Sequence, residues 1–260
     1  MSERVISRSS QVTFVALAAA AVVAGCGAGH GEPAHGLARA KTIVPTCAAG
    51  TQRPVGSATV AYAAFVVRPT NAFRSPGRAP IARFGLRNVN RAPMVFGVVG
   101  EQLDRRCRVT WLHVALPMRP NGVTGWVRAR DVKLALVRTR IEIDLSSRRL
   151  RLFRRGRLVL SSTVAVGSSA TPTPLGRYYV NQRLVPADPG GPFGPGAVGI
   201  SAFSNVLTGW TQGGPIGIHG TNEPWSIGRA VSNGCIRLPN QALRRLFRQA
   251  VDGTPVVIHP

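Results

Sequence analysis

Hydrophobic and polar positions alternate along several short segments in the second half of the chain. Residues 141–145 and 149–153 alternate one by one, and the runs 164–166 and 178–180 continue the apolar theme. A period of two predicts strands with one buried face. Arg155-Gly156, between two such runs, predicts a hairpin turn. We therefore expect the second half to be mostly β.

One segment near the C-terminus has helical periodicity instead. Its apolar stripe consists of Leu243, Leu246, Phe247 and Ala250. This spacing predicts a helix over residues 241–251, with Asn240 as its N-cap and Gly253 just past its end. Residues 255–258 then read as a last strand. The Pro- and Gly-rich residues 186–199 are expected to form a loop flanking a cleft.

The first half divides into a leader, a tether and a second β region. Short apolar segments separated by Pro, Asn and Gly turns occur at 60–67, 94–99, 111–114 and 125–127. This spacing predicts a small β-barrel over residues 59–136. Residues 26–58 are rich in Gly, Ala and Pro and lack periodicity, which indicates a flexible tether.

Residues 1–25 have the features of an export signal. Arginines precede an apolar run over residues 12–25 that is too short to span a bilayer as a mature helix. The run ends in Val23-Ala24-Gly25-Cys26, the form of a bacterial lipoprotein cleavage site, so we expect Cys26 to carry lipid. The alternative is an ordinary signal peptide cut near Ala28, with Cys26 incidental.

The net charge of +23 comes almost entirely from arginine, since Lys41 and Lys133 are the only lysines. Such a charge favours a polyanionic partner. The basic residues are spread over both halves and no aromatic-rich nucleic-acid motif accompanies them, so anionic lipids and wall polymers are expected rather than nucleic acid. An arginine-rich coding bias is the alternative explanation.

The candidate chemistry lies in residues 217–222 and 230–238. Cys235 is the candidate nucleophile, because a thiolate attacks carbonyl groups well once a base or a positive charge is nearby. His219, at the end of a short apolar strand, is the candidate base. A lone cysteine or histidine is usually a packed core residue. The glycines around both favour a reactive site instead.

The neighbours of the cysteine support this interpretation. Gly234 lets a carbonyl approach closely, and the backbone N–H groups of Gly234 and Cys235 are candidates for stabilising an oxyanion. The hydroxyl or backbone of Ser232 is expected to orient the imidazole. Arg237, two residues beyond Cys235 in an extended segment, points to the same side, where it can hold a substrate carboxylate or lower the pKa of the thiol.

These residues resemble a known active-site signature. His219-Gly220-Thr221-Asn222, followed by Ser232-Asn233-Gly234-Cys235-Ile236-Arg237, is similar to that of YkuD-type L,D-transpeptidases. Asn233 stands where many members carry histidine. The likeness covers residues 138–259 and includes the Thr-Pro-rich residues 171–176. Residues 111–127 resemble the closing strands of bacterial SH3-like domains.

The resemblance implies a mainly β protein, with a small SH3-like β-barrel before a β-rich catalytic domain that has one C-terminal helix. It implies peptidoglycan stem peptides as substrates, crosslinked between third-position diamino acids through an acyl-enzyme. Its site would comprise Cys235 as nucleophile, His219 as proton donor and acceptor, Ser232, Gly234, and the substrate-binding residues Arg237, Gly220 and Asn233. No cofactor or metal is implied.

Three alternatives stay open at this point. One is an L,D-carboxypeptidase with water as the acceptor, and a second is a catalytically silent wall-binding lipoprotein. A wall endopeptidase of the NlpC type fits less well, because its cysteine precedes its histidine in the chain. We expect export to the outer face of the cytoplasmic membrane or the wall, with a lipid anchor. Cys47 and Cys107 remain available for a disulfide. The sequence gives no oligomeric state.

Overall fold

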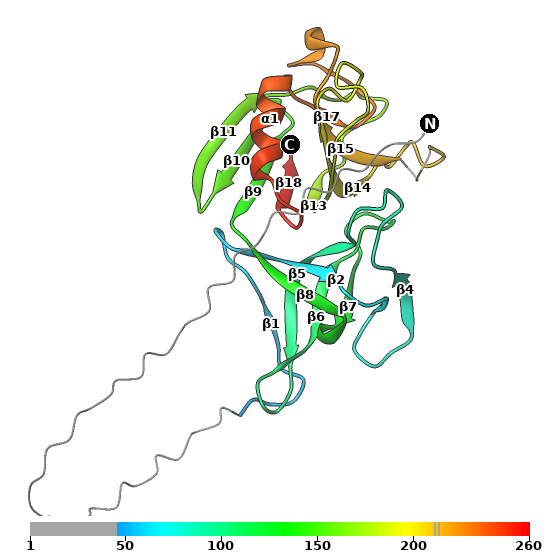
Figure 1. Cartoon of the computed structure of the whole chain (residues 1–260), viewed down its shortest axis with the longest axis vertical. Coiled ribbons are helices and arrows are strands. Elements are labelled where there is room, and N and C mark those ends of the chain that lie inside the picture. The colour runs from blue at the N-terminus through cyan, green and yellow to red at the C-terminus, as the bar shows by residue number, and fades with distance from the viewer. Residues whose placement is uncertain (1–45, 211, 213) are drawn as a thin grey trace, which may run out of the picture.

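The computed structural model describes residues 46–210, 212 and 214–260. They form two β-rich halves, with only Arg138 between the last strand of the first and the opening strand of the second (Figure 1). Within this part of the chain, α1 (Asn240–Gln249) is the one α-helix. The expectation of a mainly β protein with a single C-terminal helix is therefore confirmed.

The first half is an antiparallel sheet. Its elements are β1 (Gln52–Pro54), β2 (Ala61–Val66), β3 (Thr70–Phe73), β4 (Pro80–Phe84), β5 (Val95–Leu103), β6 (Val109–Ala115), β7 (Thr124–Arg128), the 3-10 turn η1 (Ala129–Asp131) and β8 (Val132–Val137). The order is β4-β3-β7-β6-β5-β2-β8, with β1 also paired to β5. The four apolar segments of the sequence coincide with β2, β5, β6 and β7. The sequence pattern did not predict β3, β4 and β8.

The end of the expected tether is folded. Cys47 forms a disulfide with Cys107, with 5.2 Å between their Cα atoms. β1 pairs with β5, with Arg53 opposite Glu101. Residues 46–58 therefore belong to the first half, because a covalent bond and a strand ladder hold them there. The export signal, Cys26 and the rest of the tether lie outside the described residues.

The second half contains a second large sheet and a small one. Its elements are β9 (Thr139–Asp144), β10 (Arg149–Arg154), β11 (Arg157–Thr163), β12 (Val166–Gly167), β13 (Gly176–Leu184), β14 (Ala197–Phe203), β15 (Pro215–His219), η3 (Pro224–Ser226), β16 (Ala230–Ser232), β17 (Ile236–Arg237), α1 and β18 (Pro255–His259). The large sheet has the order β11-β10-β9-β18-β13-β14-β15-β17, and β12 pairs with β16.

The period-two alternation places one face of these strands in the core. Ile141, Ile143, Leu150 and Leu152 are fully buried, and Leu243 and Leu246 of α1 pack against the same cluster. The helix begins differently from the expectation, because Pro239 is its N-cap and no side chain caps it. The side-chain oxygen of Asn240 instead accepts a hydrogen bond from the Thr221 N–H at 2.8 Å. Asn240 therefore connects the helix start to the segment after His219.

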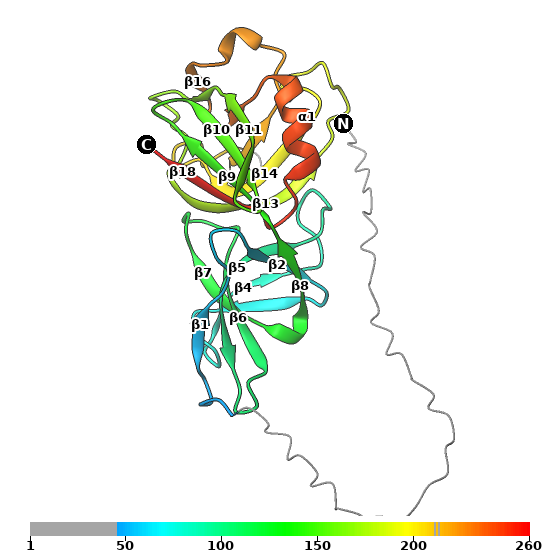
Figure 2. The ribbon, with the colours of Figure 1, turned by 90° about the vertical axis from the view of Figure 1, so that its left-hand side faces the viewer.

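The two halves are packed against each other (Figure 2). The Tyr179 hydroxyl donates to the Val95 carbonyl at 3.1 Å. The Asn121 amide donates to the Phe203 carbonyl at 2.7 Å and accepts from the Phe203 N–H at 2.9 Å. The first half therefore contacts the second through hydrogen bonds of the Tyr179 hydroxyl and of the Asn121 side-chain amide.

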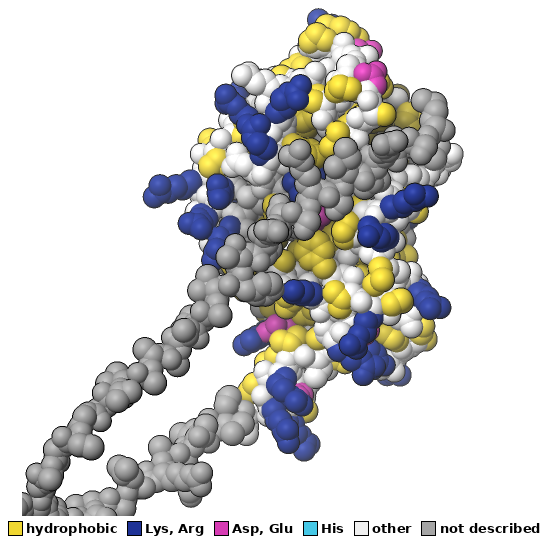
Figure 3. All heavy atoms as spheres, in the orientation of Figure 1, with side chains coloured by type: hydrophobic (Ala, Val, Ile, Leu, Met, Phe, Trp, Pro, Cys, Tyr) yellow, Lys and Arg dark blue, Asp and Glu magenta, His cyan; other side chains and the backbone are white. Residues whose placement is uncertain are grey.

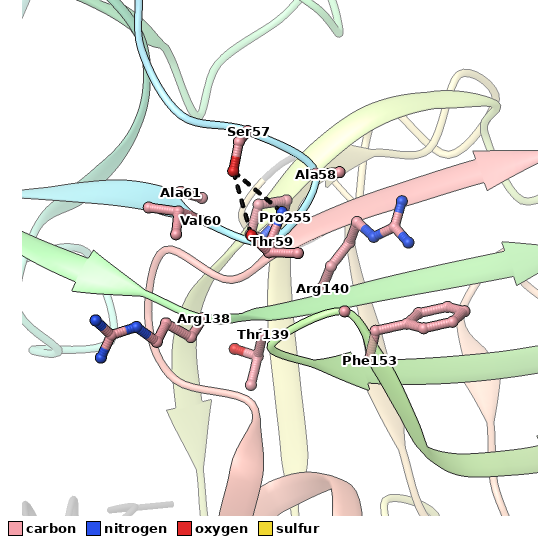
Figure 4. Close-up of a pocket in the computed structure, with 11 residues that line it drawn as sticks. Ser57, Ala58, Thr59, Val60, Ala61, Arg138, Thr139, Arg140, Phe153 and Pro255 are labelled. Carbon is pink, nitrogen blue, oxygen red and sulfur yellow. Dashed lines mark hydrogen bonds between the residues drawn. The ribbon is translucent and has the colours of Figure 1, made fainter.

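A small pocket lies at this junction (Figure 4). The loop 57–61 forms one wall, where the Thr59 N–H donates to the Ser57 hydroxyl at 3.2 Å, and residues 138–140 with Phe153 and Pro255 form the other. None of the candidate catalytic residues lines it, so this pocket is not where the expected chemistry occurs.

Basic side chains occupy both halves of the face seen in Figure 3, and acidic ones are few. This distribution agrees with the spread of arginine along the sequence. Among residues 46–210, 212 and 214–260, no helix is long and apolar enough to cross a membrane.

Candidate active site

Strand pairing brings the candidate base and nucleophile to one face of the second half. β15 and β17 are parallel neighbours, with Ile218 opposite Ile236 and His219 opposite Arg237. Ile218 and Ile236 are fully buried in the core. Because side chains alternate along a strand, His219 and Arg237 lie on the opposite face from these isoleucines, and Cys235 directly precedes β17.

Gly217 sits at the same level as Cys235 on this face. A Cβ built there would meet only the Val198 carbonyl, at 3.6 Å, so the space beside the thiol is open on that side.

The imidazole is held by a backbone carbonyl. Nδ1 of His219 bonds the Gly220 carbonyl oxygen at 2.6 Å. A carbonyl can only accept, so Nδ1 carries the proton and Nε2 keeps its lone pair. The ring of Phe193, from the loop after β13, meets the imidazole edge-on with centroids 5.0 Å apart. His219 is therefore fixed in the tautomer that a general base requires.

Burial sets the charge of the imidazole. It lowers the pKa of His219 to about 4, the Gly220 hydrogen bond opposes this, and the Arg237 charge lowers the pKa further. Burial also raises the pKa of the Cys235 thiol, against a backbone hydrogen bond from Gly217 and the Arg237 charge, which lower it. The resting pair is therefore a neutral imidazole and a neutral thiol.

The thiol of Cys235 is free and the residue is half-buried. Across the described part of the chain, no hydrogen bond connects it to the His219 ring, whose Nδ1 is occupied by Gly220. Catalytic hydrogen bonds are often long before substrate binds. Proton transfer from thiol to imidazole must accompany attack, because neither group is charged beforehand.

Ser232 orients the nucleophile segment rather than the imidazole. Its hydroxyl donates to the Cys235 carbonyl at 2.5 Å and accepts from the Gly234 N–H at 3.2 Å. The expected position of Ser232 beside the ring is thus taken by the Gly220 carbonyl. The Gly234 N–H, expected to be an oxyanion donor, is already engaged in this turn.

The Thr-Pro-rich segment supports the same turn from behind. The Thr173 hydroxyl donates to the Gly234 carbonyl at 2.9 Å, and the Thr171 hydroxyl donates to the Ser232 carbonyl at 3.0 Å. Gly234 has a φ of 106°, which a residue with a Cβ rarely adopts. The backbone around the nucleophile is therefore fixed by side chains from a distant loop.

Two further residues complete the description of the site. Asn233 is exposed at the turn, and its expected role in substrate binding stays a prediction. Glu223, which the sequence did not single out, forms an ion pair with Arg237. Within the described residues, no group of three His, Cys, Asp or Glu side chains gathers as a metal site would require.

Replacing Gly220 by alanine is expected to disrupt the hold on the imidazole. A Cβ there would collide with the Asn240 side-chain oxygen and lie 2.8 Å from Pro195 Cδ. Overpacking of this kind costs about 1–3 kcal/mol of the free energy of unfolding. We expect a lower melting temperature together with slower acylation of Cys235.

Gly209→Ala is the matched control, because a Cβ at Gly209 meets nothing within 4 Å. Thermal unfolding of both variants and the rate of thiol acylation check this prediction. Equal behaviour of the two variants would contradict the close packing around Gly220.

Comparison with known proteins places the site in a family context. Residues 138–258 match the model of the YkuD family, described as the L,D-transpeptidase catalytic domain. A putative L,D-transpeptidase YkuD of Bacillus licheniformis is 41% identical over 121 residues, which are 46% of this chain and 66% of that protein. Its namesake in Bacillus subtilis is 36% identical over 119 residues, or 46% and 65% of the two chains.

The match thus spans just under two thirds of the length of these relatives and just under half of this chain. Among solved structures, the catalytic domain of the Enterococcus faecium L,D-transpeptidase is 25% identical, with 46% of this chain and 96% of that one covered and a TM-score of 0.35. Because this score is low, the family context rests on the sequence matches.

Proposed function

We propose, on the premise that residues 138–258 are a YkuD-type L,D-transpeptidase catalytic domain, that this protein crosslinks peptidoglycan stem peptides through an acyl-enzyme on Cys235. The observation that carries the proposal is the parallel pairing of β15 with β17, which sets His219 opposite Arg237 in the strand that directly follows Cys235. The neutral tautomer of His219, with Nε2 unprotonated, supports its role as general base.

In the first half-reaction, the Cys235 sulfur attacks the carbonyl carbon of the third residue of a tetrapeptide stem while His219 Nε2 takes the thiol proton. The carbon–nitrogen bond to the terminal D-alanine then breaks, and the imidazolium returns its proton to the departing amine. A thioester on Cys235 results. Because the Gly234 N–H is engaged by Ser232, the Cys235 N–H is the proposed donor to the oxyanion.

In the second half-reaction, the side-chain amine of a diamino acid in another stem attacks the thioester carbonyl. His219 accepts a proton from this amine, the sulfur leaves, and the thiol is restored when it takes the proton back. The products are a bond between third residues and free enzyme. Every proton is returned, so the cycle requires no cofactor.

Three results of one experiment separate the transpeptidase from its rivals. The protein is incubated with a tetrapeptide stem, with and without an acceptor stem bearing a free side-chain amine, and the products are resolved by mass spectrometry. We expect a dimer and free D-alanine. A trimmed tripeptide alone would indicate a carboxypeptidase, and unchanged peptide would indicate a silent wall-binding protein.

The pH dependence of acylation is expected to extend unusually far into the acid range. Since burial lowers the pKa of His219 to about 4, Nε2 stays unprotonated well below the usual histidine range. Donor acylation should hold from about pH 8 to about pH 5 and fall as the pH drops through the lowered pKa. D-alanine release measured under single-turnover conditions checks this, and an acid limb near pH 6.5 would contradict it.

The first half and the leader are proposed to place the enzyme. Residues 59–136 are proposed as an SH3-like domain that positions the catalytic half on the wall, supported by its packing against residues 179 and 203. Cys26 is proposed as the lipid-bearing residue that holds the exported protein at the outer face of the cytoplasmic membrane. The excess of arginine is consistent with anionic surroundings there.

A further inference from the structure

Arg237 is held by a carboxylate of the protein itself. Its Nη1 contacts Oε2 of Glu223, and the two side chains are 20% and 43% exposed. The Nε of Arg237 is buried without a hydrogen-bond partner. The guanidinium thus uses Nη1 for the ion pair with Glu223, and its Nε–H makes no hydrogen bond.

The backbone of Glu223 is fixed while its carboxylate can move. Its N–H donates to the Thr221 hydroxyl at 2.9 Å, and its carbonyl accepts from the Ser226 hydroxyl at 2.7 Å. Its side chain, in contrast, is close to half exposed. Because this side chain reaches solvent, water can solvate the Glu223 carboxylate when another carboxylate replaces it on Arg237.

Arg237 lies beside the residues that are proposed to react with the donor. It sits in register with His219, two residues beyond Cys235 on the same face. Its charge affects both reacting groups. In the intact donor, the terminal D-alanine carries a carboxylate one residue beyond the carbonyl that Cys235 attacks. Guanidinium groups pair with carboxylates in a bidentate geometry.

We propose that Glu223 occupies the carboxylate position on Arg237 in the free protein and that the terminal carboxylate of the donor displaces it. This inference rests on the proposed function, because it concerns the donor of that reaction. Glu223 is then a specificity-determining residue, because it competes with the terminal carboxylate of the donor for Arg237, whereas a donor without that carboxylate does not enter this competition. It returns to Arg237 when the leaving amino acid departs.

The test compares two donors that differ at one group, a tetrapeptide ending in a carboxylate and the same peptide ending in a carboxamide. Their Kd values are measured by calorimetry in the Cys235→Ala background, where no turnover occurs, with and without Glu223→Gln. Glu142→Gln is the matched control, because Glu142 pairs with Arg140 at 2.8 Å on β9 and lies outside the site.

We expect Glu223→Gln to tighten binding of the carboxylate donor about two- to fivefold, since the freed arginine no longer has a competing partner. Binding of the carboxamide donor should change by less than this, and Glu142→Gln should change neither. Equal shifts for both donors, no shift, or the same shift in the control would overturn the proposal.

Turnover with Cys235 intact distinguishes this failure from that of the proposed function. If the carboxylate donor releases no D-alanine and the carboxamide donor releases no D-alaninamide, the proposed function is wrong, whatever the Kd values show. If these leaving groups are released but Glu223→Gln leaves the preference between the two donors unchanged, only the role of Glu223 is wrong. Unchanged melting temperatures verify that the variants are folded.

Discussion

Replacing Cys235 by alanine is expected to abolish D-alanine release and crosslinking altogether. The proposed reaction passes through a bond to this sulfur, and alanine offers no nucleophile in its place. Cys235 is the one free cysteine in the described part of the chain, since Cys47 and Cys107 form a disulfide. D-alanine release from a tetrapeptide donor is the measurement.

The folded state of the variant serves as its control. Cys235 is half-buried, and removal of its sulfur leaves in place the hydrogen bonds of the Ser232 hydroxyl, which donates to the Cys235 carbonyl and accepts from the Gly234 N–H. We therefore expect a melting temperature close to that of the parent. A variant that is folded and still releases D-alanine at the parental rate would show that the chemistry lies elsewhere.

Replacing His219 by glutamine is expected to slow acylation of Cys235 by about 10²- to 10⁴-fold, the usual contribution of a positioned general base. The thiol is neutral at rest because burial raises its pKa, so attack requires a proton acceptor. Glutamine can still donate to the Gly220 carbonyl but offers no basic nitrogen. Single-turnover release of D-alanine measures the rate.

His259→Gln is the matched control for this variant. His259 lies on β18, which pairs with β9 and β13 and not with β15 or β17, and its ring contacts the Pro260 carbonyl. The control should retain the parental rate. An equal loss of rate in both variants, or no loss in His219→Gln, would remove His219 from the proposed mechanism.

Local patterns predicted most of the elements of the second half. The alternation over 141–145 and 149–153 corresponds to β9 and β10, and the apolar stripe of residues 243, 246, 247 and 250 corresponds to α1. Such patterns indicate which face of a segment is buried, and the structure confirms that the apolar face of each of these segments lies in the core. The parallel pairing of β15 with β17 was out of reach, because it joins segments through contacts that no local period encodes.

The limits of the sequence are clearest around Asn240 and Ser232. Asparagine is a common N-cap residue, yet the side-chain oxygen of Asn240 accepts a hydrogen bond from the Thr221 N–H and does not cap the helix. Ser232 had the chemistry to orient an imidazole, yet a backbone carbonyl at Gly220 does so. Every residue has a backbone carbonyl, so the sequence does not show which carbonyl accepts the hydrogen bond from the imidazole. The ion pair of Glu223 with Arg237 is similarly invisible, since neither residue type nor spacing singles it out.

The expected disulfide and the tether show the same contrast. Counting cysteines left Cys47 and Cys107 as an available pair, and the structure joins them. Low periodicity before residue 58 indicated a tether, but β1 pairs with β5 through its backbone, which needs no apolar pattern. Because of the disulfide and the backbone pairing of β1, the first folded region begins before residue 59, where the sequence pattern predicted its start.

The central claim is that Cys235 and His219 act together as an acyl-transfer pair, and the acyl-enzyme itself tests it most directly. The intact protein is mixed with a tetrapeptide donor without an acceptor, quenched in acid, and its mass is determined before and after proteolysis. We expect a tripeptidyl thioester that maps to the peptide containing Cys235 and that forms far more slowly in His219→Gln. Donor turnover with no adduct on Cys235, or an adduct on another residue, would contradict it.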